Sequence, residues 1–286
     1  MMKWKVGDVT ISRHVELVAP LEGGGVESIL PDAYPDALAS IDWLKPHFVT
    51  EDNQLLLSIH ALLLEVGDQR LIVDTCIGND KQRNNEFFHE MQTPFLEELE
   101  AAGWSRSSVD TVMCTHLHVD HVGWNTVLED GKWVPTFPNA NYLIGRTELE
   151  HWQATGDPLG DGPILADSVQ PVFDAGLATL VETDHVVSPE IRLRPTTGHT
   201  PGHVSVVIES RGEKALISGD CMHHPCQMAH PHWASSFDSN QDEGIATRKS
   251  LLAELADEPV LLIGTHFAGP TAGKVVKDGD AYRLDV

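Results

Sequence analysis

Four side chains that can bind a metal ion fall within six residues, directly after a short apolar segment. Residues 109–114 indicate a buried strand, and the chain continues as Thr-His-Leu-His-Val-Asp-His over residues 115–121. Side chains two positions apart in extended backbone point the same way, so His116 and His118 would converge on one ion. Asp120 and His121 follow where the chain must turn, and would aim at a neighbouring point. This density is not typical of a protein core and predicts a metal site at the end of a strand.

Three further candidate ligands lie later in the chain, each at a strand end or on a glycine-flanked turn. They are His199 within Thr-Gly-His-Thr-Pro-Gly-His, Asp220 within Ser-Gly-Asp, and His266 within Gly-Thr-His-Phe. Added to the first cluster, they would complete two coordination shells that share one bridging carboxylate. Imidazole and carboxylate without thiolate suit Zn²⁺, and Mn²⁺, Fe or Co²⁺ would also bind. We therefore expect two divalent metal ions per chain, with Zn²⁺ the first choice.

Predicted strands outnumber predicted helices, which indicates a layered α/β (α+β) arrangement. Two hairpins are expected, over residues 6–17 with a turn at residues 7–8 and over residues 55–74 with a turn at residues 67–69. Residues 93–102 and 244–257 favour helices, whereas residues 123–141 favour a loop. Further strands are expected at residues 109–114, 191–195, 203–209, 215–218 and 260–263.

Two segments of the chain are similar to one another. Residues 70–76 and 215–221 are both apolar strands that deliver an aspartate at their carboxyl end, Asp74 in the first and Asp220 in the second. The similarity indicates two related halves, each presenting an acidic residue at one edge of its sheet. Residues 23–52 carry Gly, Pro and acidic residues with little periodicity, and we expect this excursion to be a lid or an arm that contacts a partner subunit.

The charge balance excludes two classes of partner. The chain has 43 acidic and 19 basic side chains and a formal net charge of −24, so neither nucleic acid nor an anionic membrane surface is expected to bind it. No apolar run is long enough to span a membrane, and the first residues lack the apolar stretch of a secretory signal. The four cysteines are too scattered for a disulfide framework, which favours a reducing, cytoplasmic location.

Taken together, these motifs resemble the metallo-β-lactamase superfamily, whose signature is His-x-His-x-Asp-His followed by isolated His, Asp and His. The resemblance runs from the strand that ends at Asp74 to His266. It implies a four-layer αββα sandwich, with residues 1–286 forming a single domain of two similar halves. It also implies a ligand assignment, in which metal one is held by His116, His118 and His199. Metal two would be held by Asp120, His121 and His266, with Asp220 bridging both ions.

This ligand set implies hydrolysis. Two ions about 3.5–4 Å apart share a water and lower its pKa to roughly 7, so that a bridging hydroxide attacks the substrate. Asp120 would orient this hydroxide and carry its proton. Asp74 is either a hydrogen-bond acceptor that fixes the tautomer of a ligand histidine or an ordinary turn residue at a strand end.

Three segments, residues 120–125, 135–140 and 219–225, look like the lactonase and organophosphate-hydrolase branch of the superfamily. This branch includes N-acyl homoserine lactonases and methyl parathion hydrolase. The likeness implies a neutral, apolar small molecule cleaved at a lactone, ester or phosphotriester bond, and a homodimeric enzyme. The lactonases place a tyrosine three residues after the bridging aspartate, where this chain has His223. His223 either replaces the phenol as hydrogen-bond donor or general acid to the leaving alkoxide, or is a passive wall residue.

Aromatic side chains near these motifs are candidate walls of a substrate pocket, because apolar walls supply binding area. For each, core packing is the alternative. The histidines at positions 224, 230 and 232 are expected to belong to a loop that lines the pocket rather than to a third metal site. The candidate substrate-binding residues are Trp124, Phe137, Trp152, Trp233 and Phe267.

Other functions remain open on the sequence alone. A thioesterase similar to glyoxalase II uses the same metal set, but it binds an anionic conjugate, which a net charge of −24 does not favour. A β-lactamase is less favoured, because the main classes lack the bridging aspartate that stands here as Asp220. An iron-dependent oxidoreductase of the same fold and a non-catalytic metal-binding protein are the alternatives outside hydrolysis.

Overall fold

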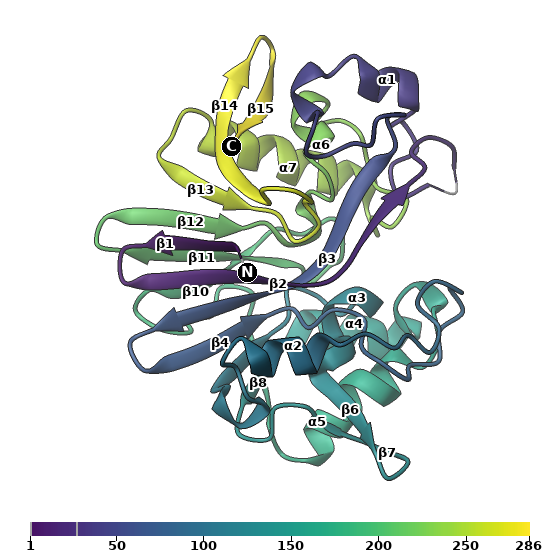
Figure 1. Ribbon diagram of the computed structural model, residues 1–286, viewed down its shortest axis with the longest axis vertical. Coiled ribbons are helices and arrows are strands. Elements are labelled where there is room, and N and C mark those ends of the chain that lie inside the picture. Colours follow the sequence, from purple (N-terminus) through teal and green to yellow (C-terminus); the bar gives the residue numbers. More distant parts are fainter. Residues whose placement is uncertain (1, 27) are drawn as a thin grey trace. The chain divides into compact units, whose positions relative to one another are not determined.

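Parallel strands end together at one edge of the larger sheet in the computed structural model (Figure 1). This sheet has the order β1-β2-β3-β4-β5-β8-β9. The pairs β1–β2 and β3–β4 are antiparallel hairpins, whereas β4, β5, β8 and β9 run parallel. The residues that follow β4 and β5 therefore lie at the same edge. The strands are β1 (Met2–Val6), β2 (Val9–Leu21), β3 (Leu55–Val66), β4 (Gln69–Val73), β5 (Thr111–Met113), β8 (Asn141–Gly145) and β9 (Ala178–Val181).

A second sheet has the order β10-β11-β12-β13-β14-β15. Its central pair, β12 and β13, is parallel, and every other neighbouring pair is antiparallel. The carboxyl ends of β12 and β13 consequently meet, as those of β4 and β5 do in the first sheet. The strands are β10 (Ile191–Pro195), β11 (Val204–Ser210), β12 (Glu213–Ile217), β13 (Val260–Ile263), β14 (Ala272–Asp278) and β15 (Ala281–Asp285).

The structure describes residues 2–26 and 28–286, and the chain divides into two units. The first unit comprises Met1–Glu16 and Ile59–Thr183, and the second comprises Leu17–Ser58 and Asp184–Val286. Each unit contains one parallel strand pair that delivers an aspartate, Asp74 after β4 and Asp220 after β12. The mixed α/β class expected from the sequence is confirmed. A single domain of two similar halves over residues 1–286 stays a prediction.

The helices are short, apart from α4 and α7. The predicted helices correspond to α2 and α7, and Gly103, with φ of +88°, follows the end of α2 as expected. The helices are α1 (Pro35–Ala39), α2 (Phe95–Ala101), α3 (Val119–Val122), α4 (Arg146–Thr155), α5 (Gln170–Asp174), α6 (Cys226–Ala229) and α7 (Gln241–Leu255). Single turns occur at Asp42–Leu44, Arg106–Ser108, Gly123–Asn125, Pro158–Gly160 and Gly219–Cys221, with a π-turn at Leu165–Val169.

The loop predicted over residues 123–141 is wrong for part of its length. Residues Thr126–Glu129 (β6) and Lys132–Pro135 (β7) pair as an antiparallel hairpin. Its two-residue turn is Asp130-Gly131, both with positive φ, which is the turn chemistry that the twist of a hairpin favours. The hairpin was not predicted, because the aromatic and proline residues around the Asp-Gly turn are typical of a loop.

The excursion over residues 23–52 contributes to the core of the second unit. Leu30, Leu38, Leu44 and Phe48 are fully buried in one hydrophobic cluster, together with Leu251 and Leu252 of α7. The histidine His224 also binds this segment, because its Nε2 donates to the Phe48 carbonyl oxygen at 2.7 Å. A role for residues 23–52 as a lid or a dimer arm stays a prediction.

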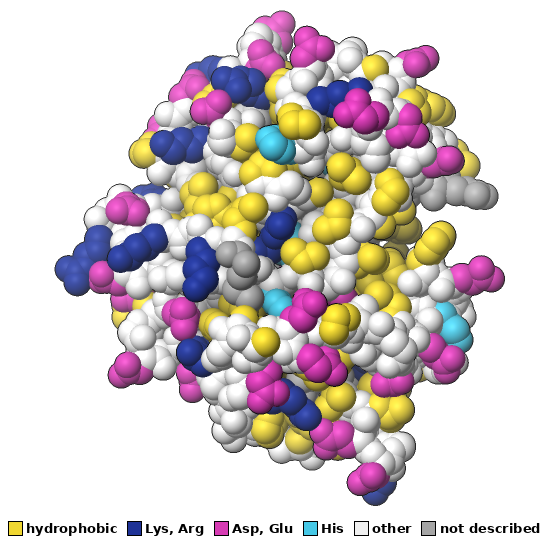
Figure 2. All heavy atoms as spheres, viewed as in Figure 1, with side chains coloured by type: hydrophobic (Ala, Val, Ile, Leu, Met, Phe, Trp, Pro, Cys, Tyr) yellow, Lys and Arg dark blue, Asp and Glu magenta, His cyan; other side chains and the backbone are white. Residues whose placement is uncertain are grey.

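Three expectations drawn from composition can be compared with the structure. All four cysteines are buried and free of disulfides. Within residues 2–26 and 28–286, no helix is long and apolar enough to cross a membrane. On the face drawn in Figure 2, acidic side chains are widely spread, with Lys and Arg side chains between them.

Candidate metal centre

In the first unit, the carboxylate of Asp74 organises the loop that follows β5. Asp74 directly follows β4 and has a φ of +59°, and its side chain is buried. Its Oδ1 accepts the backbone N–H of Thr115 at 2.7 Å, and its Oδ2 accepts the Thr115 hydroxyl at 2.9 Å. His121 Nδ1 lies 2.9 Å from the same Oδ2. With the proton on Nδ1, the lone pair of His121 Nε2 is left for an ion, so Asp74 has the tautomer-fixing position.

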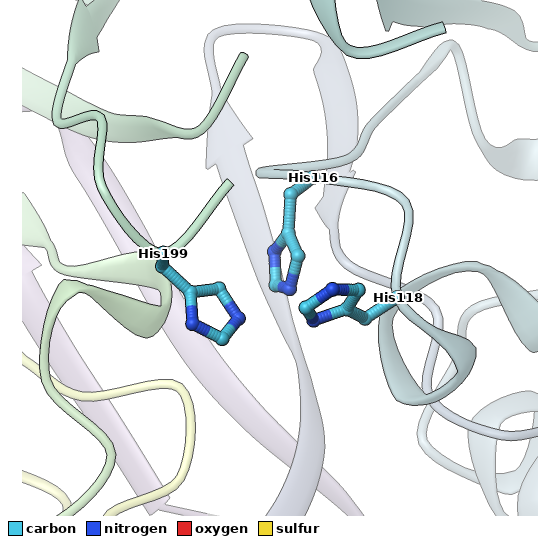
Figure 3. A group of neighbouring side chains, drawn as sticks. All are labelled: His116, His118 and His199. Atoms are coloured by element: carbon cyan, nitrogen blue, oxygen red, sulfur yellow. The ribbon is translucent and has the colours of Figure 1, made fainter. Parts of the chain in front are cut away.

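The histidines of this loop lie against one another. His118 has extended backbone and precedes α3, which carries Asp120 and His121 on its first turn, so the expected change from extended to turning chain is present. The ring centroids of His116 and His118 are 4.5 Å apart, and those of His116 and His121 are 4.1 Å apart. Figure 3 shows the imidazoles of His116 and His118 turned toward each other; the third labelled histidine, His199, belongs to the second unit.

A proton-donating chain fixes His116 in the same way as His121. His116 Nδ1 lies 3.1 Å from the Thr115 hydroxyl oxygen, and that hydroxyl donates to Asp74. Because the hydroxyl proton points to Asp74, the hydroxyl oxygen accepts from His116 Nδ1, and the lone pair of His116 is on Nε2. Asp120 is less buried than these histidines, with 19% of its side chain exposed, and its Oδ1 is 3.6 Å from His121 Nε2.

Glu148 of α4 supports the backbone between the first two histidines. Its Oε1 accepts the Leu117 N–H at 3.2 Å and the indole N–H of Trp152 at 2.7 Å. The Trp152 ring packs against His118 with centroids 5.6 Å apart. Glu148 was not predicted, because a glutamate one turn before a tryptophan in a helix is typical of an exposed position.

In the second unit, Asp220 follows β12 on a single turn of helix whose geometry depends on His203. The Asp220 N–H donates to His203 Nε2 at 2.7 Å, while His203 Nδ1 lies 2.8 Å from the Thr196 carbonyl oxygen. A Cβ at Gly219, which has a φ of +54°, would lie 2.4 Å from His203 Nε2. Glycine is therefore required there, and the motif Ser-Gly-Asp has a steric reason.

Three histidine Nε2 atoms surround one oxygen of Asp220. The distances to Asp220 Oδ2 are 3.1 Å from His266, 3.3 Å from His223 and 3.6 Å from His199. The other carboxylate oxygen, Oδ1, accepts the Thr265 hydroxyl at 2.9 Å. All of these side chains are buried. The second unit thus presents a carboxylate oxygen and several imidazole nitrogens at one point.

The Nδ1 atoms of two predicted ligands in this unit also have oxygen partners. His199 Nδ1 lies 2.9 Å from Asp238 Oδ1, and His266 Nδ1 lies 3.1 Å from the Ser58 carbonyl oxygen. As for His121, these partners leave Nε2 to bind a metal. The predicted ligands belong to groups of His and Asp side chains that could hold a metal ion, and their donor set suits Zn²⁺ and similar divalent ions.

Asp238 and Arg248 are functional candidates that the sequence analysis missed. Asp238 Oδ2 accepts the Ser235 N–H at 3.0 Å and lies 3.8 Å from an Arg248 Nη2. Burial raises the pKa of the Asp238 carboxyl, and the nearby His223, the Ser235 N–H and Arg248 oppose this shift, in that order. Arg248 is fully buried and donates to the carbonyl oxygens of Cys221 and Trp233 at 2.8 and 2.7 Å. It thereby fixes the ends of the loop that carries His223.

The five aromatic residues predicted to line a substrate pocket are all buried. Trp124 stacks on Phe95 with centroids 5.4 Å apart, and its indole N–H donates to Glu16 at 2.6 Å. Trp233 and Phe267 belong to the hydrophobic cluster of the second unit, and Phe137 is fully buried in the first. These contacts account for their burial by packing, and contact with a substrate stays a prediction.

The chain is similar to proteins of a known family. Residues 55–266 match the family model of the Metallo-beta-lactamase superfamily. An N-acyl homoserine lactonase from Bacillus sp. is 26% identical over 174 residues, which are 57% of this chain and 62% of the lactonase. The chain therefore spans less than two thirds of the length of that relative.

Two solved structures resemble this chain over nearly its whole length. The hydrolase AbOPH of the beta lactamase superfamily has a TM-score of 0.81 at 23% identity, with 99% of this chain and 96% of AbOPH covered. AidC, a dizinc quorum-quenching lactonase solved with the product N-hexanoyl-L-homoserine, has a TM-score of 0.77 at 22% identity, with the same coverage. The shared property is the fold.

Proposed function

Because the chain belongs to the metallo-beta-lactamase superfamily, we propose that it is a dinuclear metal-dependent hydrolase of lactones, esters or phosphotriesters. The observation that carries the proposal is the state of three predicted ligands, His121, His199 and His266. Each holds Nδ1 against an oxygen acceptor at 2.9–3.1 Å and so keeps Nε2 for an ion.

The proposed ligand assignment follows the family pattern. Metal one would be held by His116, His118 and His199, and metal two by Asp120, His121 and His266, with Asp220 shared. Zn²⁺ is the ion we propose, since imidazole and carboxylate ligands suit it and AidC is a dizinc enzyme. When bound, two such ions polarise the scissile carbonyl or phosphoryl oxygen and lower the pKa of a water molecule.

The protein's own residues then orient the reacting groups and move protons. Asp120 is the best placed to hold the nucleophilic water by a hydrogen bond and to accept its proton, since its carboxylate is partly exposed beside His121. Asp74 and Asp238 keep the rings of His121 and His199 in a fixed tautomer and orientation. A role for His223 as donor to the leaving alkoxide stays a prediction.

The proposed substrate is a neutral, apolar small molecule. The net charge of −24 disfavours an anionic substrate, and the lactonases in the comparisons act on acyl homoserine lactones by their names. A homodimer and a cytoplasmic location are further predictions from the sequence.

The decisive experiment is a substrate panel on Zn²⁺-loaded protein, with a chelator-treated sample as control. The panel contains lactones of several chain lengths, aryl esters, phosphotriesters, a thioester and a cephalosporin, ranked by kcat/KM. We expect a lactone, ester or phosphotriester to rank first and activity to vanish on chelation. A thioester or cephalosporin in first place, or activity that survives complete metal removal, would contradict the proposal.

A further inference from the structure

His223 is a buried histidine whose ring nitrogens have no hydrogen-bond partner among the described residues. Only 1% of the residue is exposed. Its backbone is held firmly, because its N–H donates at 2.8 Å to Gln227 Oε1, and Gln227 Nε2 donates to the Trp233 carbonyl oxygen at 2.9 Å. Burying an imidazole without partners costs free energy, so this position calls for a ligand that binds nitrogen.

The adjacent residue shows that this loop can satisfy a buried histidine with protein groups alone. His224 is equally buried, yet its Nε2 donates to the Phe48 carbonyl oxygen at 2.7 Å and its Nδ1 accepts the Cys226 N–H at 3.1 Å. Burial lowers the pKa of His224 to about 4, so it is a neutral structural histidine. His223 differs in having its imidazole directed at the carboxylate of Asp220.

We propose that His223 is a metal ligand, and that the second unit supplies His199, Asp220 and His223 together to one divalent ion, the ion that the family pattern assigns to His199. One ligand atom from each of the three lies within 4.8 Å of the others. Nε2 of His223 is 3.3 Å, and Nε2 of His199 is 3.6 Å, from Asp220 Oδ2. Two ligands about 2.0–2.1 Å from a tetrahedral ion are separated by roughly 3.3 Å, so these distances suit a shared ion.

Ring orientation agrees with this assignment. The rings of His199 and His223 have centroids 4.8 Å apart and are inclined at 68°, so they do not stack, and the Nε2 atom of each lies within 3.6 Å of Asp220 Oδ2. The ring of His266 is parallel to that of His223 with centroids 6.0 Å apart, so it approaches Asp220 from a separate position. His223 is therefore an additional nitrogen donor beyond the seven ligands that the family pattern supplies.

The inference deepens the proposed function, since it rests on a metal centre at Asp220. The lactonase branch that the sequence resembles has a tyrosine at this position, and a neutral phenol donates hydrogen bonds. Replacing the phenol by imidazole supplies a nitrogen that binds Zn²⁺, Co²⁺ or Ni²⁺ well. We expect this chain to hold the ion at Asp220 more tightly and with one more imidazole than a tyrosine-containing site would.

The test measures metal binding without any substrate. Apo-protein is titrated with Zn²⁺ against a competing chelator, and with Co²⁺ while its visible absorption is recorded. Loss of a residue that only supports a ligand costs about 10–100-fold in affinity, so His223→Ala should weaken one of the two ions by about 100-fold and change the Co²⁺ spectrum. His223→Tyr and His223→Asn should behave like the alanine variant, whereas His223→Asp, which keeps a ligating atom, should recover part of the affinity.

His232→Ala is the matched control, because it also removes an imidazole from this loop. The ring of His232 contacts His230 rather than Asp220. It should bind both ions like the unaltered chain. Unchanged Zn²⁺ affinity and an unchanged Co²⁺ spectrum in His223→Ala would overturn the inference, as would loss of turnover alone, which would assign His223 to the substrate.

A measurement on the unaltered protein keeps the inference testable if the variants do not fold. Loading with ¹¹³Cd²⁺ and recording ¹H–¹⁵N spectra of the imidazoles should show coupling between the metal and the Nε2 of His223. Absence of that coupling, with coupling to His199 present, would refute the His223 assignment alone. Absence of all histidine coupling would instead refute the metal centre of the proposed function.

Discussion

At the scale of single residues, a predicted histidine ligand in each unit is held by a buried carboxylate at Nδ1, the ring nitrogen that does not face the metal. Asp74 binds His121, and Asp238 binds His199, each at 2.9 Å through Nδ1. Neither carboxylate can be replaced by water, because both side chains are buried. Asp120 differs from them in being partly exposed, which is consistent with a role in proton transfer rather than in support.

The variant Asp120→Asn should lose most of its activity. The amide keeps the size of the side chain but cannot accept a proton, and general acid–base groups contribute typically 10²–10⁴-fold, so kcat should fall by about 10²-fold or more. The unfolding midpoint in denaturant should stay close to that of the unaltered chain. Metal analysis on the same sample separates a lost ion from a lost proton acceptor. Full turnover of every active lactone and ester would count decisively against the mechanism.

The variant Asp238→Ala should weaken metal binding, because His199 would lose the acceptor that fixes its tautomer. Loss of such an acceptor costs about 10–100-fold in metal affinity. Asp238→Asn keeps an oxygen acceptor, so its metal affinity should lie between that of the unaltered chain and that of Asp238→Ala. Asp242→Ala, which removes an exposed carboxylate from the first turn of α7, is the control and should bind metal normally. Equal affinities in Asp238→Ala and Asp242→Ala would show that His199 needs no support.

At the scale of elements, the predicted ligands of each unit lie where parallel strands end. β4 and β5 deliver Asp74 and the histidine loop to one edge of a sheet, and β12 and β13 deliver Asp220 and His266 to one edge of the other. The helix α4 braces the first of these loops through Glu148, which accepts two buried donors. Rigid supports of this kind keep ligand atoms in place before a metal arrives.

The variant Glu148→Ala should destabilise the fold. It leaves the Leu117 N–H and the Trp152 indole N–H without their acceptor, and each buried unsatisfied donor costs about 1–3 kcal/mol, so the free energy of unfolding should fall by about 2–6 kcal/mol. Glu148→Gln keeps an acceptor oxygen and should recover much of the loss. Glu150→Ala, on the exposed face of α4, should change stability by about 0.5 kcal/mol at most. Urea unfolding monitored by tryptophan fluorescence measures the free energy of unfolding of all three variants. Equal values for Glu148→Ala and Glu150→Ala would show that the hydrogen bonds of Glu148 do not stabilise the fold.

What the sequence predicted correctly was local in the chain. The hairpins at residues 6–17 and 55–74, the strand before His116 and the helix α7 all follow from neighbouring residues. The hairpin β6–β7 and the helix α4 were missed, the first because its Asp-Gly turn lies among prolines and aromatics, the second because its buried face includes a glutamate. Asp238 and Glu148 were missed since their partners lie 39 and 31 residues away, and only tertiary structure joins them.

At the scale of the whole molecule, the charge is strongly one-sided while some cations are buried. Lys81 and Arg83 in the first unit are fully buried and share the carboxylate of Asp167. Arg83 makes the closer pair, with contacts of 2.6 and 3.0 Å, whereas Lys81 Nζ is 3.6 Å from that carboxylate and 3.6 Å from the centre of the Trp133 ring. Two cations beside one carboxylate leave an excess positive charge in the interior. The free energy of unfolding should therefore change when Lys81 loses its proton.

Stability should therefore rise between pH 7 and 8, because burial lowers the pKa of Lys81 from 10.5 to about 7. In this interval the unfolded chain keeps the Lys81 proton and the folded chain releases it, so the free energy of unfolding increases, by about 1 kcal/mol for one such group. The interval ends at pH 8 because the four buried thiols begin to titrate in the unfolded chain above that value and act in the opposite direction. Lys81→Met removes the titrating group and should flatten the dependence, whereas Lys277→Met, at an exposed lysine, should keep it. Urea unfolding at pH 7.0, 7.5 and 8.0 measures the slope, and an equal slope in the Lys81→Met variant would assign the effect to other groups.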